Sequence, residues 1–112
     1  MHELSLASAV VDTVERHADG QPVSVISMRI GALRQVVAES LELYVELVGR
    51  GTAAEGARLE IEHVPARLRC CGEWEAPPFS CRVCGRGGEV VAGDEFLVES
   101  IYIEEGACIA HA

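Results

Sequence analysis

The stretch CRVCG, Cys81–Gly85, decides how this 112-residue chain folds. Two thiolates three positions apart, followed by a glycine that lets the chain curl beneath them, form a knuckle that grips one Zn²⁺ ion. A second pair of cysteines, Cys70 and Cys71, lies ten to eleven positions before Cys81 and also precedes a glycine. Because four thiolates close a structural zinc site, the sequence predicts one Zn²⁺ bound by Cys70, Cys71, Cys81 and Cys84.

The adjacent cysteines depart from the usual ligand spacing. Neighbouring side chains in an extended chain point to opposite faces, so Cys70 and Cys71 reach one ion together only if a tight turn swings them to the same side. The alternative is that Cys71 alone is a ligand. The fourth ligand would then be His63, Cys108, His111 or water.

The segment around the cysteines, residues 66–95, differs in composition from the rest of the chain. It holds four of the five cysteines, five of the eleven glycines and two of the four prolines, and it has no helical periodicity. Such a segment cannot build its own apolar core, so a metal must hold it together. We therefore predict a zinc-ribbon-like β-hairpin lobe here, as an inserted zinc-binding domain.

The sequence on either side has regular hydrophobic periodicity. Apolar residues recur at helical spacing over residues 4–17 and 41–48, and alternation predicts strands at 23–30, 58–64 and 96–104. In the last of these strands the residues expected to share one apolar face are Leu97, Ile101 and Ile103. The predicted fold class is α+β: two helices on a three-stranded sheet form an α/β lobe of residues 1–65 and 96–112, with 66–95 inserted.

Charge and hydropathy restrict the function. Nine arginines, no lysine and eighteen acidic residues give a net charge of −9. This balance excludes lysine-based chemistry and argues against nucleic-acid binding, which needs clustered cations. No apolar run is long enough to span a membrane and no signal peptide is visible, so we expect a cytoplasmic protein whose cysteines bind metal.

The N-terminal residues Met1, His2 and Glu3 offer a free amine, two backbone amides and an imidazole within one short segment. Nitrogen donors in this arrangement suit the square-planar geometry that Ni²⁺ and Cu²⁺ prefer. A helix that begins within a few residues would anchor the segment. Glu39, near the second helix, is a further candidate carboxylate, although an acid at a helix start is also explained by the helix dipole.

Three features in this order resemble one protein family. They are the start Met1–Ser5 (MHELS), the stretch Arg50–Ala57 (RGTAAEGA) before a Leu-Glu-Ile-Glu strand, and the two Cys-Gly pairs. Together they resemble the hydrogenase nickel-incorporation accessory proteins of the HypA/HybF type, from Met1 to about residue 105. The spacing of Cys70 and Cys71 departs from the family, which uses two Cys-x-x-Cys pairs, and the tail after residue 106 extends past the resemblance.

The resemblance implies a nickel metallochaperone and not an enzyme. It implies that Ni²⁺ is carried transiently at His2 and Glu3, with the Met1 amine as a further donor, while Zn²⁺ is structural. The implied partners are a nickel-insertion GTPase, the large subunit of [NiFe]-hydrogenase and, for some members, urease maturation proteins.

Two other functions compete with nickel delivery. A zinc-ribbon adaptor that binds a protein partner would not depend on the N-terminal donors. A thiol oxidoreductase would use Cys81 and Cys84, but redox pairs of this kind precede a helix, and no helical pattern follows Cys84.

Overall fold

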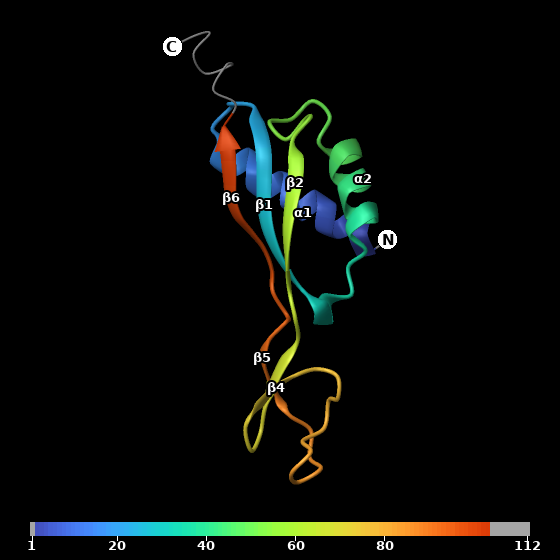
Figure 1. Cartoon of the computed structure of the whole chain (residues 1–112). Helices are drawn as coiled ribbons and strands as arrows, with labels where there is room; N and C mark the ends of the chain where they lie inside the picture. Colours follow the sequence, from blue (N-terminus) through green and yellow to red (C-terminus); the bar gives the residue numbers. More distant parts are fainter. Residues whose placement is uncertain (1, 104–112) are drawn as a thin grey trace. The chain divides into compact units, whose positions relative to one another are not determined.

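The computed structural model describes residues 2–103, with side chains from Glu3 onward. Two α-helices, a short 3₁₀ helix and six strands follow one another along this part of the chain (Figure 1). Their bounds are α1 His2–Ala18, β1 Val23–Gly31, η1 Ala32–Arg34, α2 Ala38–Val48, β2 Arg58–Val64, β3 Arg67–Arg69, β4 Glu73–Glu75, β5 Glu89–Ala92 and β6 Phe96–Ile103. The predicted α+β class is confirmed.

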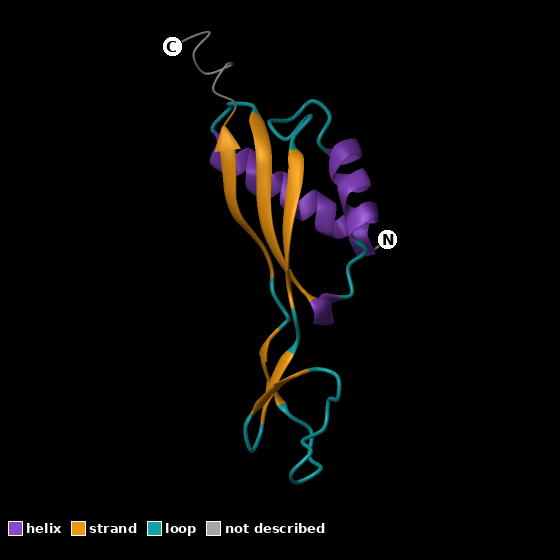
Figure 2. Ribbon diagram, in the orientation of Figure 1, coloured by secondary structure: helices purple, strands orange, loops and turns teal. Residues whose placement is uncertain are grey.

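The strands form two sheets of three strands each, ordered β2-β1-β6 and β4-β3-β5 (Figure 2). The chain divides into two compact units. Unit 1 comprises Met1–Met28, Val36–Ile61 and Val98–Ala112, and unit 2 comprises Arg29–Gln35 and Glu62–Leu97. The assignment of nickel binding to residues 1–65 with 96–112, and of zinc binding to 66–95, stays a prediction.

Unit 1 is built around the apolar faces of its helices and its central strand. Helix α1 packs against α2 and runs across one face of the strands (Figure 1). Val14 of α1, Met28 of β1 and Leu41 of α2 are completely buried. Burial of each such side chain contributes about 1.5–3 kcal/mol to the stability of this unit. Neither helix among the described residues is long and apolar enough to span a membrane.

Unit 2 has a much smaller core, centred on β3. Its largest buried side chains are Leu68, which is 2% exposed, and Ile30, which is 4% exposed. The indole of Trp74 donates a hydrogen bond to the Pro78 carbonyl at 2.6 Å. A Cβ atom at Gly88 would lie 2.8 Å from the Leu68 Cβ and 2.7 Å from the Trp74 ring, so only glycine fits there. So few apolar contacts leave the unit dependent on another source of stability.

Ion pairs across the second sheet add to that core. Strand β3 pairs antiparallel with both β4 and β5. Arg69 on β3 lies 3.8 Å from Glu73 on one neighbour and 3.3 Å from Glu89 on the other. Exposed pairs of this kind contribute about 0–1 kcal/mol each, so they align the strands more than they stabilise them.

Candidate metal centre

A tight loop brings the adjacent cysteines to one side of the sheet. Strands β3 and β4 pair up to Arg69 and Glu73, which leaves only Cys70, Cys71 and Gly72 to reverse the chain. The loop is closed by a hydrogen bond from the Cys70 N–H to the Gly72 carbonyl at 2.9 Å. Because these residues form a bend and not an extended strand, the rule that neighbours point to opposite faces does not apply to them.

The second pair of cysteines lies on a knuckle. The Gly85 N–H donates to the Cys81 carbonyl at 2.8 Å, and the Cys81 N–H donates to the Arg86 carbonyl at 2.6 Å. Gly85 has a φ of +78°, in the left-handed region where glycine carries no steric cost. A bridge between Ser80 and Gly87 closes the base of the turn. The turn therefore presents two thiols on one side, as the sequence motif predicts.

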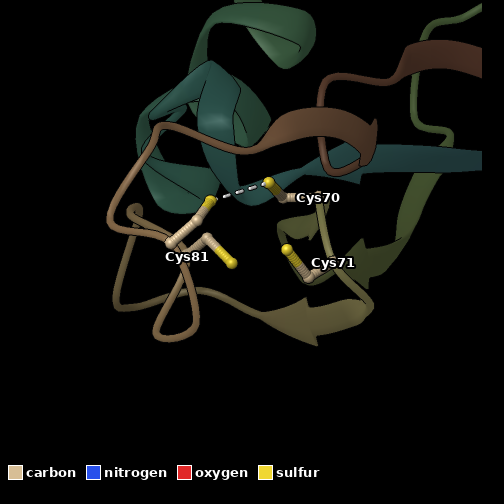
Figure 3. A group of neighbouring side chains, drawn as sticks. Cys70, Cys71 and Cys81 are labelled. Atoms are coloured by element: carbon tan, nitrogen blue, oxygen red, sulfur yellow. Dashed lines mark hydrogen bonds between the residues drawn. The ribbon is translucent and has the colours of Figure 1, made fainter.

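The two loops bring four thiols together (Figure 3). The Sγ atoms of Cys70, Cys71, Cys81 and Cys84 all lie within 4.8 Å of one another, and those of Cys70 and Cys84 are 3.4 Å apart. Zinc–thiolate bonds of about 2.3 Å in a tetrahedron place sulfur atoms about 3.8 Å apart. The observed sulfur–sulfur distances lie on both sides of this value and need only small shifts to hold Zn²⁺, so the donor set fits this metal in number, chemistry and geometry.

The alternative zinc ligands are placed less favourably or fall outside the described residues. Among residues 2–103, His63 is not part of the cysteine group. Cys108 and His111 lie outside the residues that the structure describes. Four donors are therefore available without the alternative in which Cys71 is a ligand and Cys70 is not.

The cysteines have very different proton affinities when no metal is bound. A hydrogen bond with Cys84 raises the pKa of the Cys70 thiol to about 12, because Cys70 must keep its proton to donate it. Hydrogen bonds from the backbone N–H groups of Cys84, Cys71 and Val83 lower the pKa of Cys81 to about 6. A thiol whose thiolate form is stabilised by backbone N–H groups is already largely deprotonated at neutral pH. Metal binding then does not have to displace a proton from it.

This difference predicts the pH dependence of the metal-free, reduced protein. As the pH rises through about 6, Cys81 should lose its proton while Cys70 stays protonated to a pH near 12. Because the folded pKa of Cys81 lies below its ordinary value of 9.0, its thiolate contributes most stability above pH 9.0 and loses that contribution as the pH falls through 6. The ultraviolet absorbance of thiolates, recorded against pH, should show the low transition in the wild type and in Cys108→Ser. A low transition that survives in Cys81→Ser would assign it to another group.

The N-terminal segment lies against the start of the second helix. Helix α1 begins at His2, and the Glu3 carboxylate accepts a hydrogen bond from the Val37 N–H at 3.3 Å. Val37 is the N-cap residue of α2 and has no side-chain cap of its own. Glu39 lies in the first turn of the same helix. Met1 and the side chain of His2 lie outside the residues that the structure describes.

Sequence reasoning missed this contact between Glu3 and Val37. The two residues are 34 positions apart, and a valine that is recognised through its backbone N–H leaves no pattern in the sequence. The contact gives the Glu3 carboxylate a structural task. One oxygen of the Glu3 carboxylate accepts this bond, and the backbone of Glu3 takes no part in it.

Known proteins resemble this chain in sequence. The family described as "Hydrogenase/urease nickel incorporation, metallochaperone, hypA" matches residues 1–103 of this chain. The hydrogenase maturation factor HypA of Geobacter metallireducens is 40% identical over 111 residues, which cover 93% of this chain and all of the relative. That of Streptomyces avermitilis is 39% identical over 117 residues, which cover 95% of this chain and 89% of the relative.

Two solved structures have the same fold. The solution structure of the Ni metallochaperone HypA from Helicobacter pylori superposes with a TM-score of 0.69 at 19% identity, covering 92% of this chain and 97% of its own. A second HypA solution structure gives a TM-score of 0.70 at 19% identity, with 93% and 97% coverage. At this identity the likeness bears on the fold alone. The family match, in contrast, includes both the N-terminal segment and all four clustered cysteines.

Proposed function

Because this chain belongs to the HypA family of hydrogenase/urease nickel-incorporation metallochaperones, we propose that it receives Ni²⁺ at Met1, His2 and Glu3 and passes it on. The receiver is a nickel-insertion GTPase acting with the large subunit of a [NiFe]-hydrogenase. The observation that carries this proposal is the anchoring of the first turn of α1 to α2 through Glu3 and Val37. It supports a chelating segment held in place at a chain terminus, where a partner can reach it.

Nickel is the cargo of this protein, so its site must release the ion as well as bind it. An amine, a backbone amide and an imidazole from consecutive residues can be displaced one after another, each by a donor of the receiving protein. The Glu3 carboxylate, bonded to the Val37 N–H, holds the segment in register while this exchange proceeds. This chain then needs no catalytic group, as expected of a metallochaperone.

Zinc has a different role in the proposal. Cys70, Cys71, Cys81 and Cys84 would hold it and supply the stability that the small core of unit 2 lacks. Four-thiolate sites exchange slowly, so this ion is retained and not delivered. We assign zinc binding to residues 66–95 and nickel binding to 1–65 with 96–112. We place the protein in the cytoplasm, where thiols stay reduced and serve as metal ligands.

Hydrogenase activity in cells tests the proposal. In a strain that lacks its own HypA, this chain with a C-terminal tag should restore the activity of a [NiFe]-hydrogenase, and excess nickel should partly replace the chain. The same chain with an N-terminal tag should fail, because the tag blocks the amine and displaces the chelate. Equal rescue by both tagged forms would favour the zinc-ribbon adaptor, whose function does not depend on the N-terminus.

A further inference from the structure

The negative charge of this protein belongs entirely to one of its two units. Unit 2 contains six arginines and six acidic residues, so its formal charge is zero. Unit 1 contains three arginines and twelve acidic residues, and it accounts for the whole net charge of −9. A field of this kind favours a cationic partner and accelerates its approach. The unit proposed to carry nickel is therefore also the unit that attracts a basic surface.

Several acidic residues of unit 1 have a structural task. Glu15 accepts a hydrogen bond from the Ala53 N–H at 2.8 Å, Glu55 accepts one from the Gly51 N–H at 3.2 Å, and Glu60 pairs with Arg58 at 2.8 Å. These carboxylates fix loops and strand ends. Their presence is explained by these contacts within the fold and does not require a partner.

Of the three acidic residues of helix α2, Glu39 lies in the first turn, where the helix dipole favours an acid, and Glu42 and Glu46 have no such task. Glu39, Glu42 and Glu46 are all exposed, and within residues 2–103 none of them makes an ion pair or a hydrogen bond. Helix α2 contains no lysine, arginine or histidine. Like charges three and four positions apart destabilise a helix by about 0.2–0.5 kcal/mol per pair. Glu42 and Glu46 repel each other and make no bond within residues 2–103, so they point to a use outside the fold.

Exposed apolar side chains lie beside these acids. Leu43 is 52% exposed, Leu47 is 44% exposed, and Val37 at the N-cap is 53% exposed. At 3.6 residues per turn, Leu43 and Leu47 form one row and the glutamates form the neighbouring row. The leucine row faces away from Leu41 and Val45, which are buried. Glu42 and Glu46 lie at the side of the helix, where they line a cavity together with Val45 and Arg58. The outer side of α2 thus combines an apolar stripe with an acidic edge.

The start of this surface lies next to the proposed nickel-binding segment. The hydrogen bond from Val37 to the Glu3 carboxylate joins the first turn of α1 to the start of α2, and Figure 1 shows the start of α1 beside that end of α2. A protein docked along the outer side of α2 would therefore come close to the chain terminus. This proximity is the geometry that ion transfer requires.

We infer that the outer face of α2, formed by Val37, Leu43 and Leu47 with Glu39, Glu42 and Glu46, is the docking surface for the nickel-receiving partner. The inference rests on the proposed function, and it adds that the partner offers an apolar anchor surrounded by lysine or arginine. Charge complementarity identifies this occupant, since a second copy of the chain would bring two acidic faces together. Apolar contacts at the centre would hold the complex, and the acidic edge would steer its formation.

Two paired variants test the inference with the purified full-length chain and the nickel-insertion GTPase as the probe. E42Q/E46Q removes two charges from the face, and L43S/L47S removes its apolar stripe. The control D12N/D19N removes two charges from exposed positions of the same unit outside α2, and asparagine suits the positive φ of 56° at residue 19. Binding is titrated at low and at physiological ionic strength, and the nickel affinity of each variant is measured separately.

We expect both α2 variants to bind the GTPase about tenfold more weakly or worse, with unchanged nickel affinity, while the control stays within about twofold of wild type. E42Q/E46Q should also weaken the dependence of binding on salt more than the control does. Wild-type affinity in both α2 variants, with a wild-type chain that binds nickel and the GTPase, would overturn the docking surface alone. A wild-type chain that binds neither would overturn the proposed function and the docking surface with it.

Discussion

Replacement of Cys81 by serine is expected to abolish zinc binding and to unfold unit 2 while unit 1 stays folded. Structural zinc sites in small domains contribute about 10–16 kcal/mol, so one thiolate of four accounts for about 3 kcal/mol or more, at least about 100-fold in affinity. The apolar core of unit 2 is too small to compensate for the loss of this free energy. Leu68 and Ile30 are its largest buried side chains, and Cys81, at 4% exposure, is itself part of the core.

The two units have separate spectroscopic signals, which makes the outcome easy to measure. Trp74 is the only tryptophan of the chain and lies in unit 2, where its indole is bonded to Pro78. Both α-helices, α1 and α2, lie in unit 1. In Cys81→Ser, as in wild type treated with a strong chelator, Trp74 fluorescence should shift to that of an exposed indole. The helical circular dichroism should remain close to that of the zinc-bound protein.

The other cysteines serve as matched controls for the zinc site. Cys108→Ser should keep one zinc per chain, because the four clustered thiols suffice without it. Cys70→Ser and Cys71→Ser should each lose zinc as Cys81→Ser does. Full zinc content in Cys70→Ser would instead support Cys71 as the only upstream ligand. Full zinc content in Cys81→Ser would refute the proposed four-thiolate site.

Hydrophobic periodicity predicted the long elements well. Helices α1 and α2 and strands β1, β2 and β6 all lie within a few residues of their predicted bounds. Each of these elements has one more buried face. On β1, Ile26 and Met28 are fully buried, and Ser27 between them is only half-buried. Periodicity identifies an element when one of its faces is covered over several residues.

The short strands of unit 2 could not be predicted in the same way. Strands β3 and β4 have three residues each, too few for a period to appear. Their positions depend on two loops that close around four thiols, so the organising contact is between distant cysteines. The sequence motif predicted that the four cysteines come together, and the bend at Cys70–Gly72 explains why adjacent cysteines do not prevent it.

Exposure within β6 was only partly predicted. Ile101 and Ile103 are half-buried, whereas Leu97, expected on the same apolar face, is 42% exposed. Strand β6 is at the edge of its sheet, with β1 on one side only. Alternation shows that a segment is a strand, but it does not show how far along that strand a neighbouring element covers it.

Replacement of His2 by alanine is the second change for which we expect a large effect: specific nickel binding should be lost, with zinc content and fold unchanged. The imidazole is the one side-chain nitrogen in the proposed chelate, and its loss opens the fused rings around the ion. We expect nickel affinity to fall at least about 100-fold, or about 3 kcal/mol. Because the amine and the imidazole ordinarily have pKa values of about 7.7–8.0 and about 6.5, wild-type binding should weaken as the pH falls below about 7.

Equilibrium dialysis of the untagged protein against Ni²⁺, with zinc measured in the same samples, would detect this loss. His63→Ala is the matched control, since His63 is an exposed histidine of unit 2 and not part of the cysteine group. Wild type and His63→Ala should each bind one nickel and one zinc. A folded His2→Ala protein that binds nickel as tightly as wild type would refute the N-terminal site.

The Glu3→Gln variant distinguishes two ways in which Glu3 can support that site. Its carboxylate accepts a hydrogen bond from the Val37 N–H, and the glutamine amide oxygen can accept the same bond. If Glu3 contributes to nickel binding through its backbone, the substitution should leave nickel affinity within about twofold, because the anchor to α2 and the amide nitrogen both persist. If the carboxylate were itself a ligand, nickel affinity would fall as it does in His2→Ala. One carboxylate oxygen would then bind the ion while the other keeps its hydrogen bond to the Val37 N–H.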